Sequence, residues 1–120
     1  MPNYVDGFVL PLPTKNLAAY RSMAGKAGKI WKEHGALDYW ECVGDDLEGK
    51  GMLSFTRLAK AKPDETVILA WVVYKSRKHR DQVNAKVMAD PRLAAMCDPK
   101  NPLFDFKKMA YGGFAAIVHR

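Results

Sequence analysis

Four basic side chains crowd the first turn of a predicted helix: Arg77, Lys78, His79 and Arg80. Cations are disfavoured there by roughly 0.3–1 kcal/mol each, because the helix dipole places its positive end at this turn. These side chains could gather around an anion held at the helix N-terminus. They could equally pair with acids nearby in the sequence or with a partner subunit. We favour ion pairing and keep Arg77, Lys78 and Arg80 as candidate anion contacts.

Metal-binding residue types are present but poorly spaced. The histidines and cysteines do not fall at the short intervals typical of zinc sites; they are His34, His79, His119, Cys42 and Cys97. The pair Asp45-Asp46 could ligate a hard cation, but a solvated turn is the favoured interpretation. We expect neither a metal nor a cofactor.

The two cysteines are also weak candidates for nucleophilic catalysis, which needs an activated thiol or hydroxyl beside a base. Cys42 stands next to Glu41 in a predicted strand, where alternation points the two side chains to opposite faces. Cys97 precedes a loop, and nothing near it marks a reactive thiol. Residues 1–7 lack the features of a secretory signal, so we expect reduced, buried thiols. No phosphate loop, nucleotide fingerprint or Gly-x-Ser-x-Gly elbow occurs.

The elements that position these residues are organised around residues 66–74. This run is apolar and rich in β-branched and aromatic residues, which is typical of a strand buried on both faces. A helix is expected after it, from Ser76 as the N-cap to Asp90, where Pro91 ends it. Because the strand has no polar face, it needs a cover on each side.

The rest of the chain divides into shorter predicted elements. Apolar side chains at alternating spacings of three and four predict an amphipathic helix over 15–34, capped by Thr14 and Gly35. Gly25 and Gly28 weaken that helix by roughly 1 kcal/mol each relative to alanine, which indicates close packing on a sheet. Strands are predicted over 4–10, ended by Pro11 and Pro13, and over 36–43, 52–58 and 110–118. Gly112-Gly113 in the last strand suggests a bulge or a close backbone contact. A short helix is predicted over 91–96.

This order of elements, β-α-β-insert-β-α-β, is the ferredoxin-like arrangement of an α+β protein. We expect a single domain over residues 1–120, with an insert around 44–65 and an antiparallel sheet whose helices cover one face. The other sheet face stays apolar, and a large exposed apolar face is unfavourable in water. Packing against the same face of a second copy would cover it, so we predict a homodimer joined through the sheet.

Charge and hydropathy argue against several function classes. The net charge of +6 comes from Lys and Arg residues spread along the chain, so a solvated surface is the favoured interpretation. No apolar run approaches the roughly 20 residues that span a bilayer, and we expect a cytoplasmic protein. RNA-recognition domains share this strand order, but their third strand carries a basic residue and glycines among aromatic residues. Residues 66–74 have neither, so nucleic-acid binding is not expected.

Several stretches together resemble the YbaA-like family of small bacterial proteins of unknown function. They follow one another along nearly the whole chain: residues 4–8, 35–37, 41–46, 71–74, 88–92, 104–109 and 111–114. The resemblance implies a dimeric α/β-barrel fold and brings no established activity or catalytic residues. The chain departs from the family at Ala115, where an acidic residue often stands.

Dimeric α/β-barrel proteins commonly hold a small ligand between the sheet and its helices. By that analogy, six residues are the candidate lining of a pocket: Tyr20, Trp31, Tyr39, Trp40, His79 and Tyr111. Aromatic side chains at such spacings more often belong to a core or an interface. The leading hypothesis is a protein that binds or transforms a small molecule there without a cofactor. The alternative is a non-catalytic regulatory or interaction module.

Overall fold

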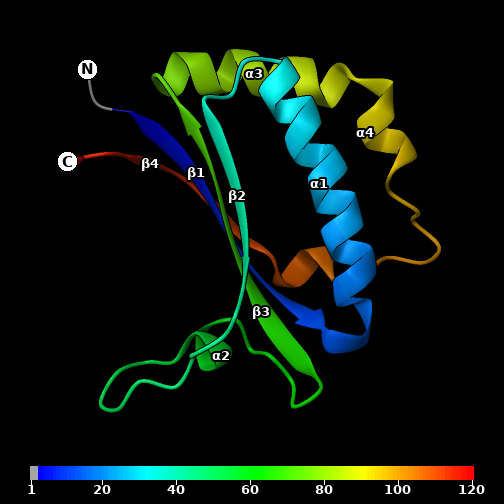
Figure 1. Cartoon of the computed structure of the whole chain (residues 1–120), viewed down its shortest axis with the longest axis vertical. Coiled ribbons are helices and arrows are strands. Elements are labelled where there is room, and N and C mark those ends of the chain that lie inside the picture. The colour runs from blue at the N-terminus through cyan, green and yellow to red at the C-terminus, as the bar shows by residue number, and fades with distance from the viewer. Residues whose placement is uncertain (1–2) are drawn as a thin grey trace.

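A computed structural model describes residues 3–120 as a four-stranded antiparallel sheet with its two long helices on one side (Figure 1). Met1 and Pro2, which begin the segment tested for a secretory signal, lie outside the described residues. The strands are β1 (Tyr4–Pro13), β2 (Asp38–Val43), β3 (Glu65–Tyr74) and β4 (Ala110–Ala115), and the helices are α1 (Leu17–Glu33), α2 (Phe55–Leu58), α3 (Arg77–Ala89) and α4 (Pro91–Ala95). Within residues 3–120, no helix is both long and apolar enough to cross a membrane.

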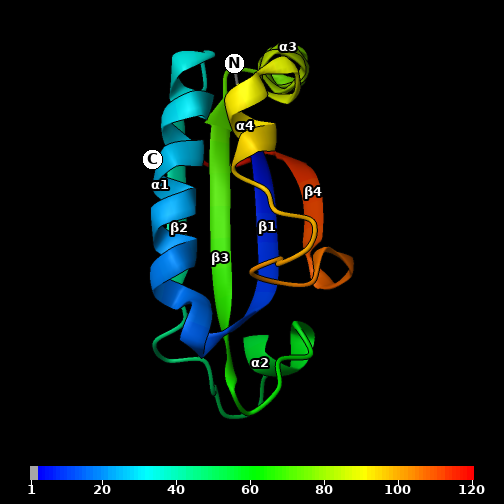
Figure 2. The same ribbon diagram turned by 90° about the vertical axis from the view of Figure 1, so that its right-hand side faces the viewer.

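The strand order is β2-β3-β1-β4, and each neighbouring pair is antiparallel. The predicted ferredoxin-like fold is therefore confirmed. The two central strands pair without interruption from Tyr4 opposite Tyr74 to Pro13 opposite Glu65. Figures 1 and 2 show α1 lying along the strands, while α3 runs across the end of the sheet where β3 finishes.

Side-chain alternation divides the central strands between the two faces of the sheet. On the helix side, β1 and β3 contribute a buried row made of Leu10, Leu12, Ile68, Ala70, Val72 and Tyr74. This row packs against Tyr20, Ala24 and Ile30 of α1 and against Val83 and Val87 of α3. Each large apolar side chain removed from water in this way contributes about 1.5–3 kcal/mol to folding.

The opposite side of the sheet, here called the outer face, carries exposed aromatic and aliphatic side chains. Trp40, Leu69 and Phe114 are 50%, 38% and 63% exposed. Trp40 and Trp71 stand opposite each other in the β2–β3 ladder and stack with ring centroids 5.7 Å apart. The short helix α2 contacts β3, and it lies beyond one end of the sheet on the side away from α1 (Figure 1). Most of the outer face is therefore left open.

The start of α1 differs from the predicted Thr14 cap. Residues Thr14–Asn16 form a 3-10 turn, and the N-cap is Asn16, which makes no side-chain bond to the helix. Its amide Nδ2 donates instead to the carbonyl of Leu103, 2.8 Å away. The predicted end is confirmed, because Gly35 has φ +114° and its amide donates to the Lys32 carbonyl.

The prediction that Pro11 and Pro13 end the first strand is wrong. Both belong to β1, with Pro11 opposite Val67 of β3. The pairing of β1 with β4 stops at Val9, so one side of β1 has no strand neighbour beyond that residue. Proline is tolerated at such an edge because its missing N–H leaves no ladder bond unmade there.

The predicted strand over 52–58 is also wrong, because α2 occupies this part of the insert. The Ser54 hydroxyl oxygen accepts a hydrogen bond from the Arg57 amide at 3.1 Å, which is a helix N-cap. A local side-chain bond of this kind satisfies backbone groups that no neighbouring strand is present to pair.

The Gly112-Gly113 pair of β4 forms no bulge, and Gly113 packs closely against the side chain of Tyr4. The β1–β4 register is continuous from Tyr4 opposite Ala115 to Val9 opposite Ala110. A Cβ atom at Gly113 would collide with the hydroxyl of Tyr4. The strand ends at Ala115, earlier than predicted.

Ser76 caps the start of α3 as predicted, and Asp90, where α3 was predicted to end, also caps the start of α4. Ser76 Oγ accepts from the His79 amide at 3.1 Å, and Asp90 Oδ1 accepts from the Arg92 amide at 2.9 Å. Asp90 also lies 2.8 Å from His34 Nε2, so the junction between α3 and α4 is tied to the end of α1.

Gly25 and Gly28 provide a matched test of how α1 packs on β2. A Cβ at Gly28 would lie 2.7 Å from Cδ1 of Tyr39, whereas a Cβ at Gly25 meets nothing within 4 Å. We expect Gly28→Ala to lower the free energy of unfolding by about 1–3 kcal/mol through overpacking. Gly25→Ala should raise it by about 0.5–1 kcal/mol through helix propensity. Urea denaturation measures both, and equal stabilisation by the two changes would contradict the close contact.

Candidate functional site

A groove of about 1180 Å³ lies between α1 and the edge strand β2. Its helix wall includes four small residues, Ala18, Ala24, Gly25 and Gly28, beside larger apolar and basic side chains of α1. Its strand wall includes Tyr39, Glu41 and Val43. Because β2 is an edge strand, no further strand closes the groove on that side. Figures 1 and 2 show α1 lying over β2 along this line.

One carboxylate in this groove is held by two tyrosines. The Tyr20 hydroxyl donates to Glu41 Oε1 at 2.7 Å, and the Tyr39 hydroxyl donates to Oε2 at 2.6 Å. Tyr20 comes from the buried face of α1, while Tyr39 and Glu41 are two residues apart on β2 and so share a face. Hydrogen bonds between a neutral hydroxyl and a carboxylate are short and strong. We call these three side chains the Glu41 clamp.

The two tyrosines of the Glu41 clamp stay protonated well beyond neutral pH. Burial raises the pKa of the Tyr20 phenol above its ordinary value, and the adjacent Glu41 carboxylate raises it further. The pKa of Tyr39 is raised by the same two causes, burial first. Both hydroxyls therefore remain donors, and Glu41 is the acceptor.

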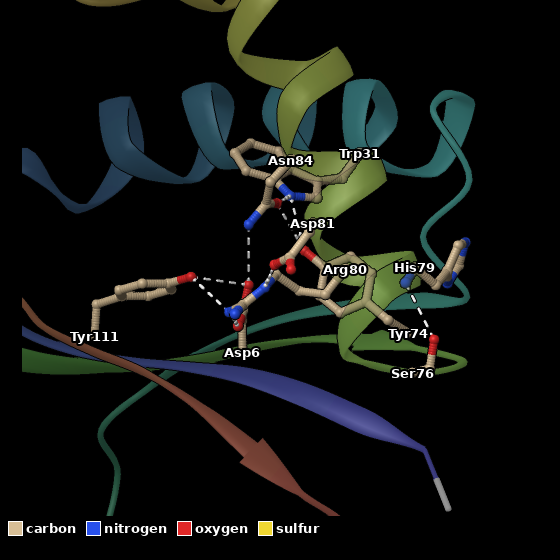
Figure 3. A network of polar contacts seen from close by, with 9 residues as sticks. All are labelled: Asp6, Trp31, Tyr74, Ser76, His79, Arg80, Asp81, Asn84 and Tyr111. Atoms are coloured by element: carbon tan, nitrogen blue, oxygen red, sulfur yellow. Dashed lines mark hydrogen bonds and ion pairs between the residues drawn. The ribbon is translucent and has the colours of Figure 1, made fainter. Parts of the chain in front are cut away.

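A second polar cluster lies under α3, on the helix side of β1 (Figure 3). Asp6 is 1% exposed, and its Oδ1 lies 2.6 Å from Nη1 of Arg80. Its Oδ2 accepts from Asn84 Nδ2 at 3.3 Å and from the Tyr111 hydroxyl at 3.2 Å. Asn84 Oδ1 in turn accepts from the Tyr74 hydroxyl and from Trp31 Nε1. This network joins α3 to both central strands and to β4.

Arg80 is fully engaged in structural contacts. Besides Asp6, its Nε lies 2.7 Å from Oδ1 of Asp81, and its guanidinium stacks 5.0 Å above the ring of Tyr4. Burial acts to lower the pKa of Arg80, but the bonds to Asp81 and Asp6 outweigh it and raise that pKa. The prediction that the basic residues of this turn form ion pairs therefore holds for Arg80. Its partner Asp6 was not predicted. Arg77 and Lys78 are exposed on α3.

The remaining candidate residues fall into separate places. Trp31 is half-buried between the two clusters, with its ring centroid 5.9 Å from that of Tyr39. His79 packs edge-on against Tyr74, and its Nδ1 accepts from the Lys75 amide. Tyr111 belongs to the Asp6 network, and Trp40 lies on the outer face. The groove thus brings together Tyr20 and Tyr39 from the predicted set.

Neither thiol is paired in the described chain. Cys42 is half-buried and Cys97 is exposed. The expectation of buried thiols is therefore wrong for Cys97, which follows α4 in an irregular surface segment, and Cys42 is buried only in part. Among residues 3–120, no group of three His, Cys, Asp or Glu side chains is arranged to hold a metal ion.

Sequence comparison places this architecture in a family. The family described as "Protein of unknown function (DUF1428)" matches residues 3–106. The chain belongs to the DUF1428 family. The uncharacterized protein YbaA of Escherichia coli K12 is 41% identical over 115 residues, covering 96% of this chain and 97% of YbaA. YbaA of Shigella flexneri has the same identity and coverage. The resemblance to the YbaA-like family is thereby confirmed.

Solved structures with low sequence identity to this chain have a similar fold. A NIPSNAP family protein of unknown function from Agrobacterium tumefaciens has a TM-score of 0.58 at 17% identity, covering 95% of this chain and 87% of that one. A dimeric ferredoxin-like protein from an uncultured marine organism has a TM-score of 0.61 at 9% identity, with both chains fully covered. At these identities the likeness extends to the fold alone.

Two central residues of these clusters escaped the sequence analysis. Glu41 is not among the predicted pocket residues, although strand alternation places it on the same face as Tyr39. Asp6 interrupts an otherwise apolar strand, which is a signal that a buried partner must exist. Its partner Arg80 is 74 residues away, and no local pattern connects the two.

The raised phenol pKa values predict a loss of stability at alkaline pH. The unfolded chain releases tyrosine protons near pH 10, whereas the folded protein retains them. Above about pH 10, each such tyrosine should therefore lower the free energy of unfolding by about 1.4 kcal/mol per pH unit. Below that pH, its contribution is unchanged.

Tyr39→Phe isolates this effect. At pH 8 the variant should be less stable than the wild type, because it lacks the bond to Glu41. By pH 11 the gap should narrow by about 1 kcal/mol, since the variant has no proton to retain at this position. Urea unfolding at both pH values measures the gap, and a gap that stays constant would contradict the raised pKa.

Proposed function

We propose that the groove between α1 and β2 binds a small organic molecule and that Glu41 is the group that recognises it. The observation that carries this proposal is the Glu41 clamp, a carboxylate lining an open groove and fixed by a donor on each oxygen. A carboxylate needed only for solubility would point freely into water. Here a buried phenol, that of Tyr20, and a half-buried one, that of Tyr39, orient it instead.

The clamp leaves Glu41 able to accept a further hydrogen bond. Each carboxylate oxygen has two lone-pair sites and uses one for a tyrosine. A hydroxyl, amine or acidic C–H group of a ligand can occupy the other. In a reaction, Glu41 is the group suited to receive a proton from the ligand, because Tyr20 and Tyr39 keep theirs. Binding without chemistry would use the same contact.

Native mass spectrometry tests this proposal directly. The protein is incubated with a bacterial metabolite extract, desalted and compared with Glu41→Gln and with the loop control Glu48→Gln. We expect a small-molecule adduct on the wild type and on Glu48→Gln. Its occupancy on Glu41→Gln should fall about tenfold, as for the loss of a hydrogen bond to a charged group. An unchanged adduct on Glu41→Gln, or none on the wild type, would contradict a role for Glu41.

We also propose that a second copy of the chain covers the outer face. Trp40, Leu69 and Phe114 are exposed there, and Trp71 and Val73 are half-buried. A patch of this kind is typical of a protein interface. The same face on a second copy is apolar in the same places, which a two-fold contact requires. The dimeric ferredoxin-like relative supports self-association in this fold.

Light scattering of Trp71→Asp tests the sheet-to-sheet homodimer. The wild type should have about twice the 13.5 kDa chain mass, and Trp71→Asp should shift toward the monomer because it buries a charge at the interface. Lys78→Asp, on the exposed side of α3, should remain a dimer. Circular dichroism separates loss of dimerisation from loss of folding. A wild type that is monomeric at micromolar concentration would refute the assembly.

A further inference from the structure

We propose that the molecule bound in the α1–β2 groove is an organic acid with an apolar body and a single anionic group, such as a carboxylate. The proposal rests on the proposed function of the groove and names the chemical class of its ligand. It comes from the distribution of charge around the groove. It also depends on which of those charges already have partners.

Four cations border the groove: Lys15, Arg21, Lys29 and Lys32. On α1, Arg21, Lys29 and Lys32 are eight and three residues apart, spacings that place them along one side of the helix. The acids that line the groove are Asp38 and Glu41. Four positive charges therefore face two negative charges around this opening.

These cations are not used for internal ion pairing. Among the described residues, no ion pair involves Lys15, Arg21 or Lys29. The single acid of α1, Glu33, instead lies 2.6 Å from Nη2 of Arg92. By contrast, the buried cation of α3, Arg80, has two carboxylate partners. The rim of the groove thus keeps charge available for an anion from outside.

The rim also has space for that anion. Gly25 lies one helical turn from both Arg21 and Lys29, and a Cβ added to it would meet nothing within 4 Å. No side chain at this position separates the two cations. An oxyanion above Gly25 could be reached by the fork of Arg21 and by the ammonium of Lys29.

The opposing acids restrict the ligand to one anionic end. Asp38 accepts from Trp40 Nε1 at 2.9 Å and from the Tyr39 amide at 3.0 Å, so it is directed along its own strand. Glu41 would repel a second negative group near the clamp. Between the cations and the Glu41 clamp, the groove is lined in part by small apolar residues, Ala18, Ala24 and Gly28. A ligand that fits these features has an apolar middle, an uncharged donor toward Glu41 and its charge at the rim.

A charge-sorted fragment screen by protein-observed NMR tests the ligand class. Equal numbers of aryl and cycloalkyl carboxylic acids, their primary amides and the matching amines are added to the full chain at pH 7. We expect the acids to shift groove resonances most often, with Gly25 and Gly28 among those affected. Arg21→Gln/Lys29→Gln should weaken binding of the acids about tenfold and leave the amides unchanged. Lys78→Gln/Lys86→Gln removes the same charge from α3 and should change neither class.

The outcomes separate this inference from the proposed function. If amides or amines shift the resonances of groove residues as often as acids do, the inference that the ligand is an organic acid is wrong. The groove then remains a binding site. Acids that bind equally well to Arg21→Gln/Lys29→Gln also overturn it. If no fragment of any class perturbs the groove, the proposed function itself fails.

Discussion

The central strand β3 is apolar on both faces, and the rest of the structure follows from the need to cover it. One face is buried by α1 and by Val83 and Val87 of α3, which explains why an amphipathic helix follows each of β1 and β3. The other face has only α2 at one end, so stacked indoles stand exposed on it. A fold of this size gains most of its stability from apolar burial. The proposed homodimer would remove this exposed apolar face of the sheet from water.

Two carboxylates lie on the helix side of this apolar sheet, and they are stabilised in different ways. Asp6 is neutralised by the guanidinium of Arg80 and bonded by Asn84 and Tyr111, so its interaction capacity is consumed within the protein. A buried charge without such a partner would be strongly destabilising. Glu41 has two neutral phenol donors and borders an open groove. The first arrangement is structural, while the second leaves an acceptor at a place that solvent or a ligand can reach.

Local patterns in the sequence predicted most of the fold and little of the site. Strand and helix periodicity identified β3, α1 and α3, because burial there follows a regular spacing. Ser76 and Gly35 marked helix ends through short-range backbone chemistry. The predictions at Pro11 and in the insert were wrong because they depended on which strands have a hydrogen-bonded neighbour. The sequence does not show which side of a strand is unpaired. The Asp6–Arg80 pair and the Tyr20–Glu41 bond join elements distant in sequence, so only the assembled sheet reveals them.

The placement of the three tryptophans gives the protein two separate optical reporters. Trp40 and Trp71 are nearly parallel on the outer face, with an interplanar angle of 15°, a geometry in which neighbouring indoles couple electronically. Trp31 lies apart from them, under the helices and beside Tyr39. Near-ultraviolet ellipticity from the stacked pair therefore reports on the outer face of the sheet. In a variant that lacks Trp40 and Trp71, emission from Trp31 would report on Tyr39 in the groove wall, so the outer face and the groove can be followed separately.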